Sequence, residues 1–278
     1  MDYFKYRFSP GQGLQTEILL AMLAAYPFVG FEEEGENLSA YVPGNIDAMT
    51  FLPDLLSLAQ QFPFQWEVET LPKQNWNAAW ERNYSPICVG TFCYVRAAFH
   101  PPAPGFRVEL QITPKMAFGT GHHETTRMML EAMELLDFMG KKVFDFGCGT
   151  GILGILAAKL GATAVLAIDL DPIAVENSLE NARLNGVSDH FTGLHTGLSG
   201  SPSGNHDVIL ANINRNVLLE SMQGLAEKLA IGGALLLSGF LDGDVEMISE
   251  KAASHGLLRK EVRHAGSWAM AAFITSPN

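Results

Sequence analysis

Three glycines at alternate positions follow a short apolar run that contains an aspartate. The stretch reads Val143-Phe-Asp-Phe-Gly-Cys-Gly-Thr-Gly151, and an apolar segment of helical length begins directly after it. This order predicts a strand, a tight turn and a helix, because glycines let the chain turn sharply and let a ligand approach the backbone closely. The N–H groups that open the helix then point at that ligand. We call residues 145–151 the glycine elbow, and we expect Asp145 and Gly149 to help bind a cofactor there.

Asp169 ends the next apolar run, 22 residues after Gly147. An acidic side chain at this position suits the two hydroxyls of a ribose, so we expect a cofactor that contains adenosine. Gly149-Thr-Gly-Ile-Leu-Gly154 also matches the dinucleotide pattern G-x-G-x-x-G, which leaves an NAD(P)-dependent oxidoreductase open as an alternative. Asp145 argues against that alternative, because a carboxylate ahead of the glycines repels a pyrophosphate and attracts an ammonium or a sulfonium.

Asn212 stands near the end of a later apolar run, beside Ile213. Its amide offers a polar acceptor near the expected reaction point, and no obvious acid for hydride transfer accompanies it. We therefore interpret Asn212 as a residue that positions a substrate amine or contacts the cofactor. The three cysteines show no zinc-type spacing, so we expect no metal.

A second glycine-rich loop, Phe118-Gly-Thr-Gly-His-His-Glu-Thr-Thr126, precedes the elbow and leads into a helix with apolar periodicity. Two glycine-rich helix starts so near each other in the chain are suited to close over one ligand. His123 in this loop has two interpretations. It is either a residue that holds the main chain, which we favour, or a general base for a reacting amine.

Strands and helices alternate through the C-terminal two thirds of the chain, which predicts an α/β domain with a mostly parallel, doubly wound sheet. Sites in such sheets lie at the carboxyl ends of the strands, where the elbow and both polar candidates stand. The last two expected strands, 257–264 and 267–275, are joined by a turn too short for a parallel crossover, so we expect them to be antiparallel. We place Trp268 in the core, and we expect two further strands at 87–99 and 106–112.

The N-terminal region has its own pattern of elements, in the order strand, helix, strand, strand, helix, strand. This is the order of the ferredoxin-like split motif, so we expect residues 1–70 to form a small α+β domain. A linker at 71–86 follows, and then the catalytic domain at 87–278. Trp76 and Trp80 in the linker are four residues apart, so one helix face would carry both, and we expect them to pack against the larger domain.

The composition is that of a folded and acidic protein. The 278 residues are 47% apolar and carry a net charge of −12, and residues 1–60 hold two basic and eight acidic side chains. This charge disfavours nucleic acid as a partner and favours a basic protein. No apolar run is long enough to span a bilayer, and the N-terminus lacks the organisation of a signal peptide. We therefore expect a cytoplasmic monomer with no membrane contact.

Taken together, the motifs resemble class I S-adenosylmethionine-dependent methyltransferases, and more closely the bacterial ribosomal protein L-eleven methyltransferase family. The resemblance rests on four strings, Ala117-Phe-Gly-Thr-Gly-His-His-Glu-Thr-Thr126, the elbow, Ile168-Asp-Leu-Asp-Pro172 and Leu210-Ala-Asn-Ile213, and it covers nearly the whole chain. It implies a Rossmann-like sheet of seven strands whose last strand is antiparallel. It also implies that the cofactor is S-adenosylmethionine.

The resemblance carries residue roles as well. It implies cofactor contacts for Thr126, Gly147, Asp169 and Asn212, and it places a further set in a loop that closes over the methionine end of the cofactor: Phe118, Gly119, Thr120 and His123. In the family, the small N-terminal domain recognises the stalk-base protein of the large ribosomal subunit, and the linker lets that domain reorient. Several amines, both lysine side chains and the α-amine, are then trimethylated. Methylation of another protein or of a small amine, and a cofactor-binding module without activity, stay open as alternatives.

Overall fold

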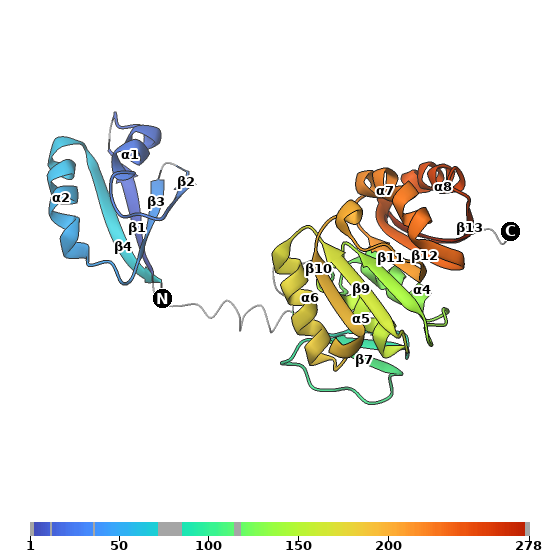
Figure 1. Cartoon of the computed structure of the whole chain (residues 1–278). Coiled ribbons are helices and arrows are strands. Elements are labelled where there is room, and N and C mark those ends of the chain that lie inside the picture. The colour runs from blue at the N-terminus through green and yellow to red at the C-terminus, as the bar shows by residue number, and fades with distance from the viewer. Residues whose placement is uncertain (1–2, 12, 36, 72–84, 114–117, 276–278) are drawn as a thin grey trace. The chain divides into compact units, whose positions relative to one another are not determined.

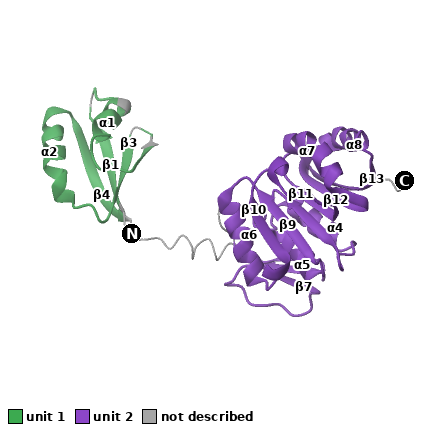
Figure 2. Cartoon of the chain, viewed as in Figure 1, with its two compact units in different colours: residues 1–83 green, residues 84–278 purple. Residues whose placement is uncertain are grey.

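The computed structural model describes residues 3–11, 13–35, 37–71, 85–113 and 118–275 (Figure 1). The chain divides into two compact units, Met1–Asn83 and Tyr84–Asn278, which are coloured separately in Figure 2. Trp76 and Trp80 of the expected linker lie outside the described residues. Each unit is therefore considered by itself.

The smaller unit has the ferredoxin-like arrangement. Its elements are β1 (Tyr3–Pro10), α1 (Thr16–Leu23), β2 (Gly30–Glu34), β3 (Asn37–Pro43), α2 (Leu52–Gln61) and β4 (Phe64–Leu71). The strands pair antiparallel in the order β2-β3-β1-β4. Tyr6 and Phe8 alternate with polar residues along β1 and stack in a core rich in aromatic rings, where Phe8 is wholly buried.

The larger unit is built on one sheet of seven strands. They are β8 (Lys142–Phe146), β9 (Ala164–Asp169), β10 (Phe191–His195), β11 (His206–Asn212), β12 (Leu229–Leu241), β13 (Leu257–Ala265) and β14 (Trp268–Thr275). Their order is β10-β9-β8-β11-β12-β14-β13, and β14 runs antiparallel to both of its neighbours. The predicted Rossmann-like sheet with an antiparallel last strand is therefore confirmed.

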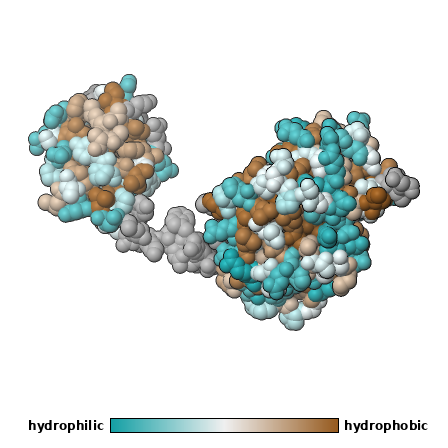
Figure 3. Space-filling model, in the orientation of Figure 1, coloured by the Kyte–Doolittle hydropathy of each residue, from teal (hydrophilic) through white to brown (hydrophobic). Residues whose placement is uncertain are grey.

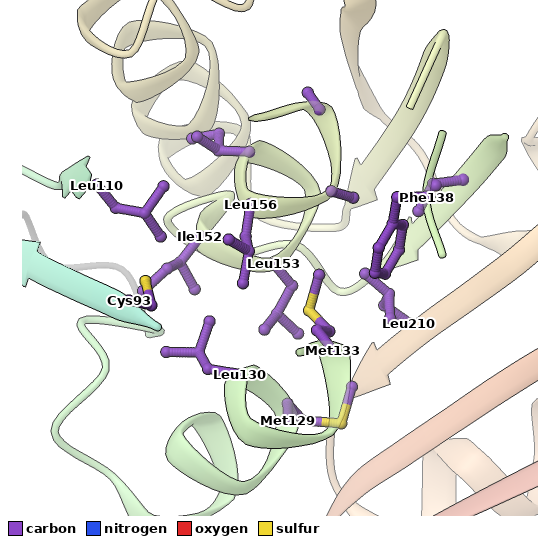
Figure 4. Close-up of a cluster of buried hydrophobic side chains, with 14 of the residues drawn as sticks. Cys93, Leu110, Met129, Leu130, Met133, Phe138, Ile152, Leu153, Leu156 and Leu210 are labelled. Atoms are coloured by element: carbon purple, nitrogen blue, oxygen red, sulfur yellow. The ribbon is translucent and has the colours of Figure 1, made fainter. Parts of the chain in front are cut away.

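Both faces of this sheet are covered by helices, so the central strands are apolar on both sides. Along β8, Val143 faces one core and Phe144 faces the other. The first core holds α4 (Glu124–Met133), α5 (Ile152–Lys159) and α6 (Pro172–Leu184). The second holds α7 (Arg215–Lys228) and α8 (Val245–Ala253). Figure 4 shows side chains of α4 and α5 meeting in the first core, which fixes the two helix starts near each other. On the face seen in Figure 3, hydrophilic and hydrophobic residues are intermixed.

A third, small sheet corrects one prediction. The expected single strand at 87–99 is two antiparallel strands, β5 (Ile87–Val89) and β6 (Cys93–Arg96), and β6 pairs parallel with β7 (Val108–Gln111). Gly90 has φ +51°, a left-handed conformation that ends the strand and turns the chain. Apolar residues stand on both sides of Gly90 and Thr91, so the sequence pattern did not separate the two strands.

Candidate active site

A cavity of about 410 Å³ lies at the carboxyl ends of the central strands of the large sheet. Its walls come from the loop before α4, the elbow, and the ends of β9, β11 and β12. The lining residues are Phe118, His123, Thr125, Gly147, Gly149, Asp169, Asp171, Ala174, Asn212, Ile213, Asn214, Gly239 and Trp268. The structure thus brings together six of the candidates chosen from the sequence. It places four others, Gly119, Thr120, Thr126 and Asp145, behind this lining or beside it.

The elbow needs its glycines for both conformation and space. Gly147, Gly149 and Gly151 all have left-handed φ values, +73°, +53° and +79°. A Cβ on Gly149 would overlap the carbonyl oxygen of Phe118, and one on Gly147 would lie 2.8 Å from the side chain of Ile213. A side chain at Gly149 would therefore push the main chain of Phe118 away from the elbow, whereas one at Gly147 would displace the end of the Ile213 side chain.

The loop before α4 is fastened to the elbow through Thr150. The Thr150 N–H donates to the Phe118 carbonyl oxygen at 2.9 Å, and its hydroxyl donates to the carbonyl oxygen of Gly119. The amide of Asn181 on α6 in turn donates to the Thr150 carbonyl oxygen at 2.9 Å. Thr120 lies farther along the loop, where its hydroxyl is 3.2 Å from Nδ1 of His122. The carbonyl oxygen of Gly119 therefore accepts one of the hydrogen bonds that hold the loop to the elbow.

Asp169 stands at the end of β9 with its carboxylate already oriented by the main chain. Its Oδ2 accepts the N–H of Gly149 at 2.9 Å, and its Oδ1 accepts the N–H of Asp171 at 3.0 Å. A carboxylate oxygen accepts more than one hydrogen bond, so both oxygens keep capacity for two hydroxyls on a ligand in the cavity. Asp171 itself caps α6, because its carboxylate accepts the N–H of Ile173 at 2.8 Å.

Asp145 lies outside the lining of the cavity, contrary to the expectation that it contacts the cofactor. Its side chain is buried, 1% exposed, because alternation along β8 turns it into the first core beside α5. Oδ2 accepts the N–H of Gly154 at 2.9 Å, so the carboxylate holds the first turn of that helix. The pKa of Asp145 is raised to about 7, mainly by burial and to a smaller extent by the nearby Asp169, while the hydrogen bond from Gly154 opposes the shift.

This raised pKa predicts a pH-dependent cost in stability. Folding favours the protonated acid, so the cost is absent below pH 3.8, grows as pH rises, and is complete above about pH 7. Asp145→Asn removes this ionisation. The free energy of unfolding of the variant minus that of the wild type should therefore increase from pH 3.8 to about pH 7. The change is on the order of 4 kcal/mol at 1.36 kcal/mol per pKa unit. Urea unfolding of both proteins between pH 4 and pH 8 measures it, and a difference that is constant with pH would contradict it.

Asn212 lines the cavity, and the oxygen of its side-chain amide is a buried acceptor. Its Nδ2 donates to Oγ1 of Thr126 at 3.1 Å, and Thr126 is wholly buried in the first turn of α4. This bond assigns Oδ1 to the other side, where it is buried and has no hydrogen-bond partner among the described residues. An unpaired buried acceptor costs about 1–3 kcal/mol, which a donor on a bound molecule would recover. Thr126 therefore acts on the site by orienting Asn212.

His123 caps α4 and packs between two aromatic rings. Its Nδ1 accepts the N–H of Thr125 at 3.3 Å and lies 2.8 Å from the Thr125 hydroxyl. The neutral ring that accepts this bond carries its proton on Nε2, which then has no lone pair for a substrate proton. The ring centroid lies 5.4 Å from that of Phe118 and 4.8 Å from that of Trp268, both in edge-to-face geometry. These contacts support the interpretation of His123 as a residue that holds the loop.

Trp268 is the lining residue that sequence reasoning placed elsewhere. It packs partly against the first core, as expected, but it also lines the cavity. Its position depends on the pairing of β14 with β12, which sets Trp268 opposite Leu241. Gly239, with φ +94° and with Ile213 packed against its Cα, was also missed. Neither position carries a local sequence signal, because both depend on contacts between distant segments.

The lining residues fit S-adenosylmethionine better than a dinucleotide. Asp169 suits the ribose hydroxyls, and the unpaired Oδ1 of Asn212 suits an ammonium donor. No Lys or Arg is among the lining residues that the structure describes, although a pyrophosphate would need a cation or several free N–H groups. Within the described ranges, no group of three or more His, Cys, Asp or Glu side chains is placed to hold a metal, and no helix is long and apolar enough to cross a membrane.

Comparisons with known proteins agree with this geometry. Residues 25–275 match the family model described as ribosomal protein L11 methyltransferase (PrmA). A ribosomal protein L11 methyltransferase of Porphyromonas gingivalis is 43% identical over 263 residues, 92% of this chain and 90% of the relative. One of Bacteroides fragilis is 34% identical over 279 residues, 99% of this chain and 100% of the relative. The crystal structure of ribosomal protein L11 methylase from Lactobacillus delbrueckii subsp. bulgaricus superposes with a TM-score of 0.64 at 29% identity, covering 69% of this chain and 99% of that one.

Proposed function

The chain belongs to the ribosomal protein L11 methyltransferase family, and from that premise we propose that it transfers methyl groups from S-adenosylmethionine to amines of ribosomal protein L11. The acceptors are lysine side chains and the α-amine. The observation that carries the proposal is that the oriented Asp169 carboxylate and the amide residue Asn212 line one cavity. The alternatives, a nicotinamide oxidoreductase among them, lack such support.

Methyl transfer requires this protein mainly to position the two reactants. When bound, S-adenosylmethionine supplies a methyl group on a positively charged sulfur, which is already a good electrophile. The protein must hold an amine lone pair in line with that methyl, and positioning supplies much of the rate. Free lysine has a pKa of about 10.4 and must lose its proton first. The apolar side chain of Ile213 in the cavity wall disfavours the charged amine, and Asn212, which lines the same cavity, carries an unpaired oxygen that can accept a hydrogen bond from the nitrogen.

The two-part organisation of the chain suggests a division of labour. We assign recognition of the ribosomal protein to residues 1–70, reorientation to the linker at 71–86, and methyl transfer to 87–278. The net charge of −12 supports a basic partner, because it attracts such a protein over distances beyond direct contact. Action as a monomer in the cytoplasm, without contact to nucleic acid, stays a prediction.

Asp169→Ala tests the cofactor assignment. The variant loses two hydrogen bonds to a charged acceptor, so the Kd for S-adenosylmethionine should rise about 100-fold, with methyl transfer to purified L11 falling in parallel. Calorimetric titration and transfer of labelled methyl groups measure the two quantities. Asp137→Ala is the matched control, because the exposed Asp137 also accepts the N–H two residues on, from Met139 at 3.0 Å, but lies away from the cavity.

The same assays separate the alternatives. Tight binding of S-adenosylmethionine without transfer to L11 would point to another protein, to a small amine, or to a module without activity. Binding of NAD(P) without binding of S-adenosylmethionine would favour the oxidoreductase. Mass spectrometry of ribosomal proteins from cells with and without the gene then identifies the substrate directly.

A further inference from the structure

A second hollow adjoins the cavity on the side away from Asp169. It has a volume of about 370 Å³, and Asn214, Gly239 and Trp268 line both hollows. The remaining lining residues of the second hollow are Arg215, Asn216, Phe240, Leu241 and Asp244. We call this second hollow the side groove.

The sheet order places the side groove beyond the reaction point as seen from the ribose site. Asp169 ends β9, and the order from there is β9, β8, β11 and β12. Asn212 ends β11, and the side groove lies past the end of β12 and at the start of α7. A cofactor whose ribose binds Asp169 and whose methyl reaches Asn212 therefore leaves the side groove free for the second reactant.

Trp268 stands at the junction of the two hollows. Its ring is held edge to face by His123, with 4.8 Å between centroids, and its strand position lies opposite Leu241. Trp is the aromatic side chain that attracts cations best, and an indole face needs no N–H on the cation it holds. It therefore suits an ammonium whose hydrogens are replaced one by one by methyl groups.

The rest of the side groove suits the aliphatic stem of such an amine. Leu241, which is 46% exposed, supplies apolar surface, and the one acidic side chain of the lining, Asp244, is neutralised by Arg215 at 2.8 Å. The Leu241 N–H also donates to Asp244 at 3.2 Å, and these contacts lower the Asp244 pKa, with the Arg215 hydrogen bond as the main cause. An amine that passes this pair meets no uncompensated carboxylate that would hold it in the protonated form.

We propose that the side groove is the path by which the acceptor amine reaches the cavity, and that Trp268 holds its nitrogen at the junction through every round of methylation. This rests on the proposed function. In each round the nitrogen lone pair forms the new N–C bond while the S–C bond breaks and its electron pair stays on sulfur. The new ammonium releases a proton to water if one remains, and the freed amine reacts again with a fresh cofactor. Retention by an indole face makes the number of methyl groups depend on Trp268.

Substitution of Trp268 tests the junction in the full-length enzyme. With purified L11, Trp268→Leu should raise the acceptor KM about tenfold and shift the products from trimethylated toward monomethylated amines. Trp268→Phe keeps an aromatic face and should stay within about threefold of wild type in both respects. Mass spectrometry of L11 reads the methylation state, and thermal unfolding establishes that each variant is folded. An unchanged product distribution in a folded Trp268→Leu protein would overturn the proposal.

Arg215→Gln tests the side groove without touching Trp268. The unpaired Asp244 would hold the incoming amine as an ammonium, so kcat should fall at neutral pH and its pH profile should move upward by about one unit, while the acceptor KM does not rise. The other titratable groups facing the two hollows are Asp169, Asp171 and His123, and Asp242 nearby is paired with His264 at 2.7 Å. These groups are the same in both proteins. A pH profile that does not move would overturn the role of the side groove.

Two controls complete the design. Arg259→Gln breaks a comparable pair, Arg259 with Glu246 at 2.7 Å, outside the lining of both hollows, and should change neither kcat nor its pH profile.

Binding of Nα-acetyl-trimethyllysine amide to the full chain with S-adenosylhomocysteine, measured by calorimetry, needs no turnover. Loss of that binding in Trp268→Leu supports the role of Trp268 at the junction, even if the wild-type enzyme leaves L11 unmodified. An unmodified L11 would refute only the proposed function. Equal binding by wild type and Trp268→Leu would refute the junction.

Discussion

Alanine at position 149 should abolish methyl transfer by separating the two walls that meet at the elbow. The new Cβ would overlap the carbonyl oxygen of Phe118, and φ at this position is +53°. The backbone conformation alone costs about 1–2 kcal/mol. Relief of the overlap moves Phe118 away and breaks its hydrogen bond with Thr150, so the lining of the cavity is lost. We expect the rate of methyl transfer to fall by at least about 100-fold, since misplacement by about 1 Å can cost that factor in rate, and the Kd for S-adenosylmethionine to rise with the loss of the cavity lining.

Gly90→Ala separates the overlap from the backbone strain. Gly90 has nearly the same φ, +51°, but a Cβ there meets nothing within 4 Å. Both variants should lose a similar amount of stability to strain in thermal unfolding. Only Gly149→Ala should lose cofactor binding in calorimetry, and equal binding by the two variants would show that the contact with Phe118 does not shape the cavity.

Asn212→Ala should lower kcat/KM for methyl transfer to L11 by about 100-fold. The change removes the side-chain amide of a residue that lines the cavity, including its buried and unpaired Oδ1, and it leaves the Thr126 hydroxyl without the amide that it binds at 3.1 Å. A hydrogen bond to a charged partner contributes about 1.5–3 kcal/mol, which corresponds to a factor of ten to more than one hundred. Steady-state kinetics measure the loss. Calorimetry with S-adenosylmethionine then divides it between cofactor binding and placement of the acceptor amine.

A matched amide far from the cavity controls for stability. Asn185 binds both main-chain groups of Gln111, at 3.0 and 2.7 Å, and so joins the end of α6 to β7. Asn185→Ala should lower the unfolding temperature without changing kcat/KM. Equal losses of activity in the two variants would mean that Asn212 acts through stability and does not contact a reactant.

Much of the fold follows from local requirements that are visible in the sequence. Apolar runs such as Val143–Phe146 mark strands that are buried on both faces, and Asp171-Pro172 marks the start of α6. The short turn before Trp268 forces the last two strands to be antiparallel. Each of these signals depends on a few neighbouring residues, so it can be interpreted without knowing how the rest of the chain folds. The strand break at Gly90 was missed because apolar runs stand directly before Gly90 and directly after Thr91.

The sequence by itself determined that a strand, a glycine turn and a helix form a cofactor elbow, and that acidic Asp169 and amide-bearing Asn212 stand at the carboxyl ends of two strands of one sheet. Only the tertiary structure decided which side chains reach the cavity. It turned Asp145 inward beneath α5, set His123 between two aromatic rings, and brought Trp268 from the last strand to the cavity wall. The physical reason is the range of the interactions. Glycine conformation and helix capping act within a turn, whereas the lining of a cavity depends on the register and packing of segments more than a hundred residues apart.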